Sequence, residues 1–182
     1  DEEIKVFAKH NCGVAHCPAS NAKLGHGIAP VDEMRAAGIA VGLGSDSVAS
    51  NNRMDLLDEA RLAVFMQRAR LGRHDALGAR AAIAMATLEG ARALGLDDQV
   101  GSLDVGKAAD LVAFPLDGLH VSPVHEPEGA LLFAASARGA SLVMVAGRTL
   151  VRGGALVSDV SADVEVVRAA ALDLRRVAES AG

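Results

Sequence analysis

The sequence predicts an α/β fold whose first half is built around a parallel sheet. The stretch "GVAHCP" (13–18) is a short apolar run that ends in a turn at Pro18, which is typical of a strand. The stretch "IAVGLG" (39–44) is apolar without alternation, as expected for a strand buried on both faces in a parallel sheet. Helical patterns precede, separate and follow these two strands. This order is typical of a (β/α) barrel or a doubly wound sheet.

Local patterns also predict the elements around the first strand. Residues 1–10 are predicted to form an amphipathic helix with Ile4, Phe7 and Ala8 on its apolar side. Residues 19–30 are rich in glycine and other small residues, and they are predicted to form a loop.

Two further helices flank the second strand. Residues 31–38 predict a short helix that ends at Gly38, because glycine readily adopts the left-handed conformation that closes a helix. Residues 56–70 predict a longer helix with one buried stripe, formed by Leu56, Ala60, Ala63 and Val64.

The pattern changes in the second half of the chain. Residues 75–95 are predicted to continue as helix in two segments, with a break between Thr87 and Gly90. A domain transition is predicted between Gly95 and Lys107, because short strands bounded by Gly and Asp turns follow it. These antiparallel strands are expected at 109–114, 141–147 and 148–154. Residues 161–180 predict one helix that begins at an Asp or Ser cap.

Composition excludes several classes of function. The chain is 51% hydrophobic and carries a net charge of −5, which argues for a globular fold and against nucleic-acid binding. Aromatic residues make up 2%, too few for a base-stacking surface. No apolar run reaches the roughly 18 residues of a membrane span. Cys12 and Cys17 do not form a disulfide framework, so we expect a reduced, cytoplasmic protein.

A lone acid follows the second strand. In "VGLGSDSVASNN" (41–52), Asp46 is surrounded by small hydroxyl and amide residues, and His16 ends the preceding strand. Residues that follow parallel strands face the mouth of an α/β active site, so an acid and an imidazole there suggest a metal or acid–base site. The alternative is that Asp46 only forms an Asx-turn or caps the next helix.

Four stretches in order resemble the last third of a metal-dependent amidohydrolase. They are residues 14–31, 37–67, 88–114 and 143–156. The nearest branch contains the S-adenosylhomocysteine/methylthioadenosine deaminases, the guanine deaminases and the chlorohydrolases. The resemblance implies the C-terminal part of a TIM (β/α)8 barrel, with its last two strands and helices, over 1–95. Part of a small β-sandwich would follow over 96–158, and a C-terminal helix over 159–182.

The resemblance also assigns roles to five residues. Asp46 matches an acid that binds the metal and carries the proton during catalysis. Ser50 is expected to contact the substrate, although it could instead cap the following helix, and Asn51 could contact substrate or simply suit the turn. His16 is expected to line the pocket or to be a packed histidine. His26 could reach the pocket and tune substrate choice.

The implied enzyme uses a divalent metal, zinc or alternatively iron, to activate water against an amino-substituted heterocycle such as a purine, pterin or triazine. The H-x-H pair and other histidines of that metal site have no counterpart in this sequence. We therefore expect a C-terminal part of a larger enzyme, completed by an N-terminal half in cis or trans, and a homodimer. Hydrolysis of a cyclic amide or a C–Cl bond is the enzymatic alternative, and a non-catalytic remnant or partner chain is the other.

Overall fold

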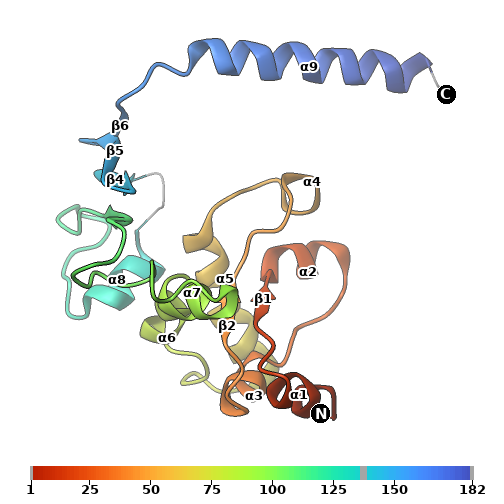
Figure 1. The fold of residues 1–182 in the computed structure, drawn as a ribbon, viewed down its shortest axis with the longest axis vertical. Helices are drawn as coiled ribbons and strands as arrows, with labels where there is room; N and C mark the ends of the chain where they lie inside the picture. Colours follow the sequence, from red (N-terminus) through yellow and green to blue (C-terminus); the bar gives the residue numbers. More distant parts are fainter. Residues whose placement is uncertain (1, 136–138, 181–182) are drawn as a thin grey trace.

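The computed structural model describes residues 2–135 and 139–180. Its first part alternates helices with two short strands (Figure 1). The elements are α1 (Glu2–Lys9), β1 (Val14–His16), α2 (Pro18–Leu24), α3 (Val31–Ala36), β2 (Val41–Leu43), α4 (Val48–Asn51), α5 (Leu56–Leu71), α6 (Ala79–Met85) and α7 (Leu88–Leu94). The second part contains β3 (Leu111–Ala113), α8 (Pro127–Phe133), β4 (Leu142–Val145), β5 (Arg148–Arg152), β6 (Ala155–Leu156) and α9 (Ser161–Ser180).

Strands β1 and β2 pair in parallel, as the sequence predicts. His16 is the partner of Leu43 at the carboxyl end of the pair. The chain continues past this end, where the backbone N–H of Gly44 donates to the carbonyl of His16 at 2.9 Å. The segments that follow both strands therefore start at the same edge of the sheet.

The predicted antiparallel strands form a separate sheet with the order β3-β4-β5-β6. All three pairings are antiparallel, and β4 carries an irregularity in register between Val143 and Met144. Burial alternates along β5, where Thr149 and Val151 are half-buried and their neighbours are exposed. The pairings confirm that the chain changes from a parallel sheet in its first part to an antiparallel sheet in its second part.

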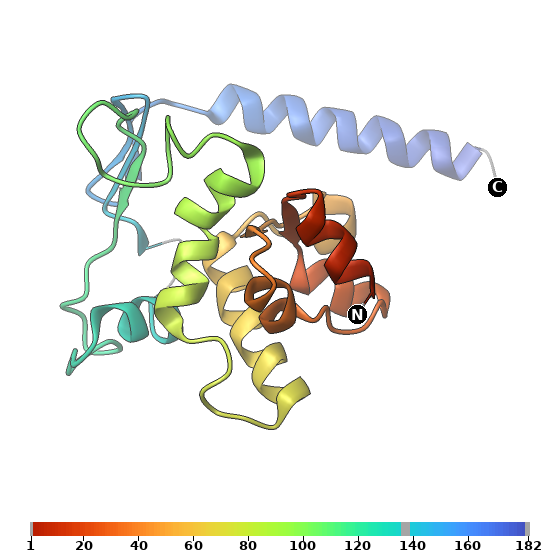
Figure 2. The same cartoon turned by 60° about the horizontal axis from the view of Figure 1, so that its bottom comes forward.

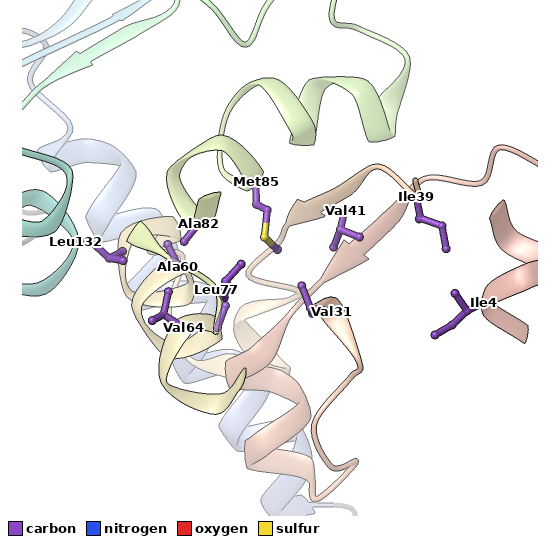
Figure 3. Packing of buried hydrophobic residues seen from close by; sticks show 11 residues of the cluster. Ile4, Val31, Ile39, Val41, Ala60, Val64, Leu77, Ala82, Met85 and Leu132 are labelled. Atoms are coloured by element: carbon purple, nitrogen blue, oxygen red, sulfur yellow. The ribbon is translucent and has the colours of Figure 1, made fainter. Parts of the chain in front are cut away.

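The hydrophobic core lies where helices cover the β1–β2 pair (Figure 3). Helices α3, α5, α6 and α7 all contact β2. The buried cluster comprises Ile4, Val31, Ile39, Val41, Ala60, Ala63, Val64, Leu77, Ala82, Met85 and Leu132. Helix α8 joins this core through Leu132, whose carbonyl accepts a 2.8 Å hydrogen bond from Arg61 of α5.

The buried stripe of α5 is confirmed for three of its four predicted residues. Ala60, Ala63 and Val64 are at most 1% exposed, whereas Leu56 is 42% exposed, so its assignment to the core is wrong. Leu56 is the first residue of α5, next to the Asp55 cap, one turn before the stripe meets the strands. Helical periodicity gives the correct face, but it does not show where along the helix packing begins.

The predicted loop at 19–30 is wrong over its first part, because residues 18–24 form α2. Pro18 occupies the first helical turn, where its missing N–H has no intrahelical partner to lose. Gly25 ends the helix with φ +73° in the left-handed region. The residue interpreted as a strand terminator therefore also begins a helix.

The remaining helix predictions are mostly confirmed. Helix α1 buries Ile4, but Phe7 is 43% exposed, so its apolar side is only partly covered. Helix α3 ends before Gly38, which has φ +82° and donates its N–H to Arg35. The helix breaks at Ala86 and Thr87, between α6 and α7, so the break predicted from Thr87 to Gly90 is right at Thr87 but wrong over residues 88–90, which belong to α7.

Helix α9 extends along one side of the molecule, away from the core (Figures 1 and 2). Every residue of α9 is exposed. The Asp159 side chain accepts hydrogen bonds from the N–H and hydroxyl of Ser161, which confirms an acid at the start of this helix. Across the described ranges, no helix combines the length and hydropathy that a membrane crossing requires.

Two glycines, Gly42 in β2 and Gly13 immediately before β1, let α7 lie directly on the parallel pair. A Cβ on Gly42 of β2 would lie 2.7 Å from the Cα of Gly90, and one on Gly13 would lie 2.2 Å from the carbonyl oxygen of Ala93. Both distances are far below van der Waals contact, and the opposing atoms belong to the backbone. The helix can therefore approach the strands only because no side chain intervenes.

We predict that Gly42→Ala lowers the free energy of unfolding by about 1–3 kcal/mol, because the added methyl group must displace the backbone of α7. Gly129→Ala is the matched control, because its nearest neighbour would be a side-chain carbon at 3.9 Å. Removing this helical glycine should stabilise α8 by about 0.5–1 kcal/mol. Urea denaturation of both variants checks the expectation, and equal stabilities for Gly42→Ala and the parent would contradict it.

Candidate active site

Asp46 lies three residues beyond β2, in an uncommon backbone conformation. Its φ is +57°, in the left-handed region that few residues other than glycine adopt. Aspartate tolerates this region better than most residues, and such outliers cluster at functional sites. The local conformation thus agrees with a functional role for this acid.

The Asp46 carboxylate is exposed and receives several hydrogen bonds. The Ser20 hydroxyl donates to Oδ2 at 2.7 Å, and the Ser47 backbone N–H donates to Oδ1 at 2.7 Å. These two bonds, followed by one from the Ser50 hydroxyl, hold the pKa of Asp46 below its ordinary value. The group is therefore ionised at neutral pH, and a carboxylate has lone pairs to spare for a ligand.

The helix caps near Asp46 are other residues. Ser47 caps α4 by accepting the N–H of Ala49 at 3.1 Å. Asp55 caps α5, where its Oδ1 accepts two backbone N–H groups. The capping alternatives for Asp46 and Ser50 are therefore wrong. The Asx-turn does not fit either, because Asp46 accepts from the adjacent residue instead of from the residue two positions on.

Asn51 uses its side chain to hold the loop together. Its Nδ2 donates to the carbonyl of Ser45 at 2.8 Å and also to the carboxylate of Glu59. At the end of α4, Asn52 adopts φ +67° and its side chain accepts a hydrogen bond from Lys23 of α2. These contacts give Asn51 a structural task, and its contact with substrate stays a prediction.

The two histidines differ in environment. His16, the last residue of β1, is 3% exposed, and neither ring nitrogen has a hydrogen-bond partner among the described residues. Burial lowers the pKa of His16 to about 4, so the ring is neutral at physiological pH. His26 is exposed in the connection after α2, and no hydrogen bond among the described side chains joins it to Asp46. Pocket roles for both residues stay predictions.

Sequence reasoning missed two residues of this site. Ser20, a buried residue of α2, bonds to an acid that lies 26 positions later. Glu59 is 2% exposed on α5 and accepts the backbone N–H of Ala19 at 3.0 Å. A signal for Glu59 was present, because it lies one helical turn before Ala63 and so shares the buried face of its helix.

The resemblance implies one metal ligand in this sequence, Asp46. Residues 2–135 and 139–180 contain no cluster of three or more His, Cys, Asp or Glu side chains that could hold a metal ion. Cys17 lies near Asp46, but burial and the Asp46 charge raise the pKa of its thiol, which disfavours the thiolate that binds metals. A catalytic zinc usually has three protein ligands, so the Asp46 carboxylate fits a metal site only as one member of a larger set.

A mostly apolar groove lies elsewhere in the described part of the chain. It encloses about 660 Å³ between the β1–β2 pair, helices α6 and α7, and residues 100–112. Its lining is mostly apolar, and it does not include Asp46, Ser50 or Asn51. Hydrogen bonding and charge, and not cavity size, identify the candidate site.

The chain is similar to known proteins along most of its length. A profile of the amidohydrolase family matches residues 1–150. A 5-methylthioadenosine/S-adenosylhomocysteine deaminase from Desulforudis audaxviator is 40% identical over 181 residues, covering 99% of this chain and 41% of the deaminase. This chain thus spans about two fifths of that relative.

Two solved structures share the fold closely. An adenosine deaminase from Xanthomonas campestris with bound zinc has a TM-score of 0.92 and 36% identity, over 96% of this chain and 40% of that one. An atrazine chlorohydrolase from Arthrobacter aurescens complexed with zinc has a TM-score of 0.86 and 37% identity, over 92% and 38% of the two chains.

The buried His16 predicts a pH dependence of stability. The unfolded histidine binds a proton near pH 6.5 and the folded one only near pH 4, so stability should fall as the pH is lowered through this window. The difference corresponds to about 3 kcal/mol. In His16→Leu this contribution is absent, whereas His26→Leu, at an exposed site, should retain it. Denaturation at pH 7 and 4.5 measures the effect, and a parent-to-His16→Leu difference that is the same at both pH values would contradict it.

Proposed function

The chain belongs to the amidohydrolase family, and from that premise we propose that it forms part of a metal-dependent aminohydrolase. The reaction would replace an exocyclic amine of a heterocycle, such as a purine, pterin or triazine, with the oxygen of water. The observation that carries the proposal is the ionised, exposed carboxylate of Asp46, held just beyond a parallel strand by three hydrogen-bond donors. The deaminase names of the relatives support the same reaction.

We further propose that β1 and β2 are the last two strands of a (β/α)8 barrel that spans residues 1–95. The four-stranded sheet in 96–158 would form part of a small β-sandwich, and 159–182 would be an appended helix. The similar deaminases match this chain over only 34–41% of their own length. The rest of the barrel would be supplied in cis or in trans, and assembly of the complete enzyme as a dimer is part of this proposal.

Asp46 would be one of the residues that hold the metal. Zinc is favoured over iron because two similar solved structures contain zinc. A divalent ion supplies a nucleophile at neutral pH, because it lowers the pKa of coordinated water to about 7. The remaining ligands would come from outside the described residues, since these provide only Asp46.

The residues around Asp46 would handle the proton and the substrate. The Asp46 carboxylate would accept a proton from the attacking water and pass it to the departing amine. Ser50 and Asn51 lie on the short helix directly after Asp46, where they would contact the ring. His16 and His26 would shape the pocket from the neighbouring strand end.

A C–Cl bond is the second candidate substrate group, because an atrazine chlorohydrolase is among the similar structures. Both reactions replace a leaving group on an electron-poor ring carbon, so one site could serve either. Release of chloride from a chlorotriazine, against release of ammonia from an aminopurine, separates the two candidates. Ring opening of a cyclic amide would indicate the third reaction of this type.

We predict that Asp46→Asn lowers kcat at least about 100-fold and reduces the zinc content of the complete enzyme, because it removes a metal ligand and a proton acceptor. The matched control is Asp75→Asn, which removes an exposed acid that is paired with Arg73. Ammonia release from methylthioadenosine, adenosine and guanine, together with metal analysis, measures both effects. A stable, metal-free complete protein without hydrolytic activity would instead favour the non-catalytic alternative.

A further inference from the structure

Glu59 is a buried acid that forms no ion pair with the described residues. Its side chain lies on α5 and is 2% exposed. No Lys, Arg or His of the described ranges forms a salt bridge with it. A buried charge is costly unless hydrogen bonds compensate it. Glu59 must therefore derive its stability in this position from the donors around it.

Those donors come from the two segments that follow the paired strands. Oε2 of Glu59 accepts the backbone N–H of Ala19 at 3.0 Å, and Oε1 accepts the amide of Asn51. Ala19 belongs to α2, after β1, and Asn51 belongs to α4, after β2. One carboxylate thus joins the segments that leave both strands.

Each segment then reaches Asp46. Ser20, next to Ala19, donates its hydroxyl to Oδ2 of Asp46 at 2.7 Å. Asn51 also donates to the carbonyl of Ser45, which precedes Asp46 in the chain, at 2.8 Å. Glu59 is therefore linked to Asp46 through Ala19 and Ser20 on one side and through Asn51 and Ser45 on the other.

From this arrangement we propose that Glu59 is a positioning residue, which holds Ser20 and the Asp46 loop in the geometry that the hydrolytic site requires. It touches neither substrate nor metal and acts through Ala19, Ser20 and Asn51. This inference rests on the function proposed above for Asp46.

A carboxylate suits this position better than an amide. An ionised glutamate offers only acceptors, whereas a glutamine presents an NH2 group on one side. In Glu59→Gln that NH2 group would face either the Ala19 N–H or the Asn51 amide. Two hydrogen-bond donors would then face each other, and no bond could form between them. Asn51 cannot relieve the conflict by turning over, because its carbonyl oxygen would then face the carbonyl of Ser45. One of the two links must weaken.

The test compares Glu59→Gln with Glu89→Gln in the complete enzyme. Glu89 bonds to Arg35 at 2.9 and 3.1 Å, so the control also loses a partly buried carboxylate but leaves the Asp46 loop intact. We expect Glu59→Gln to lower both zinc affinity and kcat about 10–100-fold, as loss of groups that orient a metal ligand does. The control should keep parent values for both. Amide hydrogen exchange over residues 44–54 should accelerate only in Glu59→Gln.

A double-mutant cycle with Ser20→Ala separates positioning from general stability. If Glu59 acts through the turn that carries Ser20, the two effects on zinc affinity will be less than additive. Parent zinc affinity and kcat in a folded Glu59→Gln enzyme would overturn the inference, even with a lower melting temperature. Should Glu59→Gln not fold, parent zinc affinity in Ser20→Ala would overturn it equally.

Failure of the proposed function gives a different result. A parent enzyme that neither binds zinc nor releases ammonia refutes the function of Asp46, whatever the variants do. Hydrogen exchange over residues 44–54 then still decides whether Glu59 orders the loop. Unchanged exchange in Glu59→Gln would overturn the positioning role independently of catalysis.

Discussion

Parallel pairing of β1 with β2 is the constraint on which the candidate site depends. The register joins His16 to Leu43, so the chain leaves both strands at one edge. Ser20 follows the first strand by four residues and Asp46 follows the second by three, and their side chains meet at 2.7 Å. In an antiparallel pair the same two segments would leave at opposite ends, and this contact could not form.

The pairing in turn depends on close backbone packing. Helix α7 lies against Gly13, just before β1, and against Gly42 in β2, where a side chain would collide with backbone atoms. The strands are only three residues long, so few ladder hydrogen bonds hold them in register. The packed helices must therefore supply much of the stability that keeps Ser20 near Asp46.

Two carboxylates in this region, Asp46 and Glu59, have different surroundings. Asp46 is exposed, and its hydrogen bonds lower its pKa while leaving lone pairs free for a ligand. Glu59 is buried, and both of its oxygens accept hydrogen bonds from protein donors. In the proposed site, the exposed acid would bind the metal and take part in the reaction, whereas the buried acid would organise the loops. The different proposed roles of the two carboxylates follow from their different burial and from the different donors around them.

Elements with a strong local signal could be predicted from the sequence. The apolar runs indicated both strands, and Gly38 marked the end of α3 because glycine accepts its φ of +82°. Position along an element was harder to predict. Pro18 can end a strand or begin a helix, and here it does both within three residues. Leu56 has the correct periodicity for the core, but it lies one turn before the packed part of α5.

The sequence by itself determined that an isolated acid would follow a buried strand, because strand pattern and residue type are local properties. It also determined that hydroxyl and amide side chains would surround the Asp46 carboxylate in the sequence. Only the tertiary structure decided which of these groups bond to Asp46. Ser20 and Glu59 reach the site from 26 positions before it and 13 positions after it, and their approach depends on strand register and helix packing. Such long-range contacts cannot be predicted from residue periodicity in a single sequence. Several serine hydroxyls could have been the partner of Asp46, and nothing in the local sequence selects Ser20.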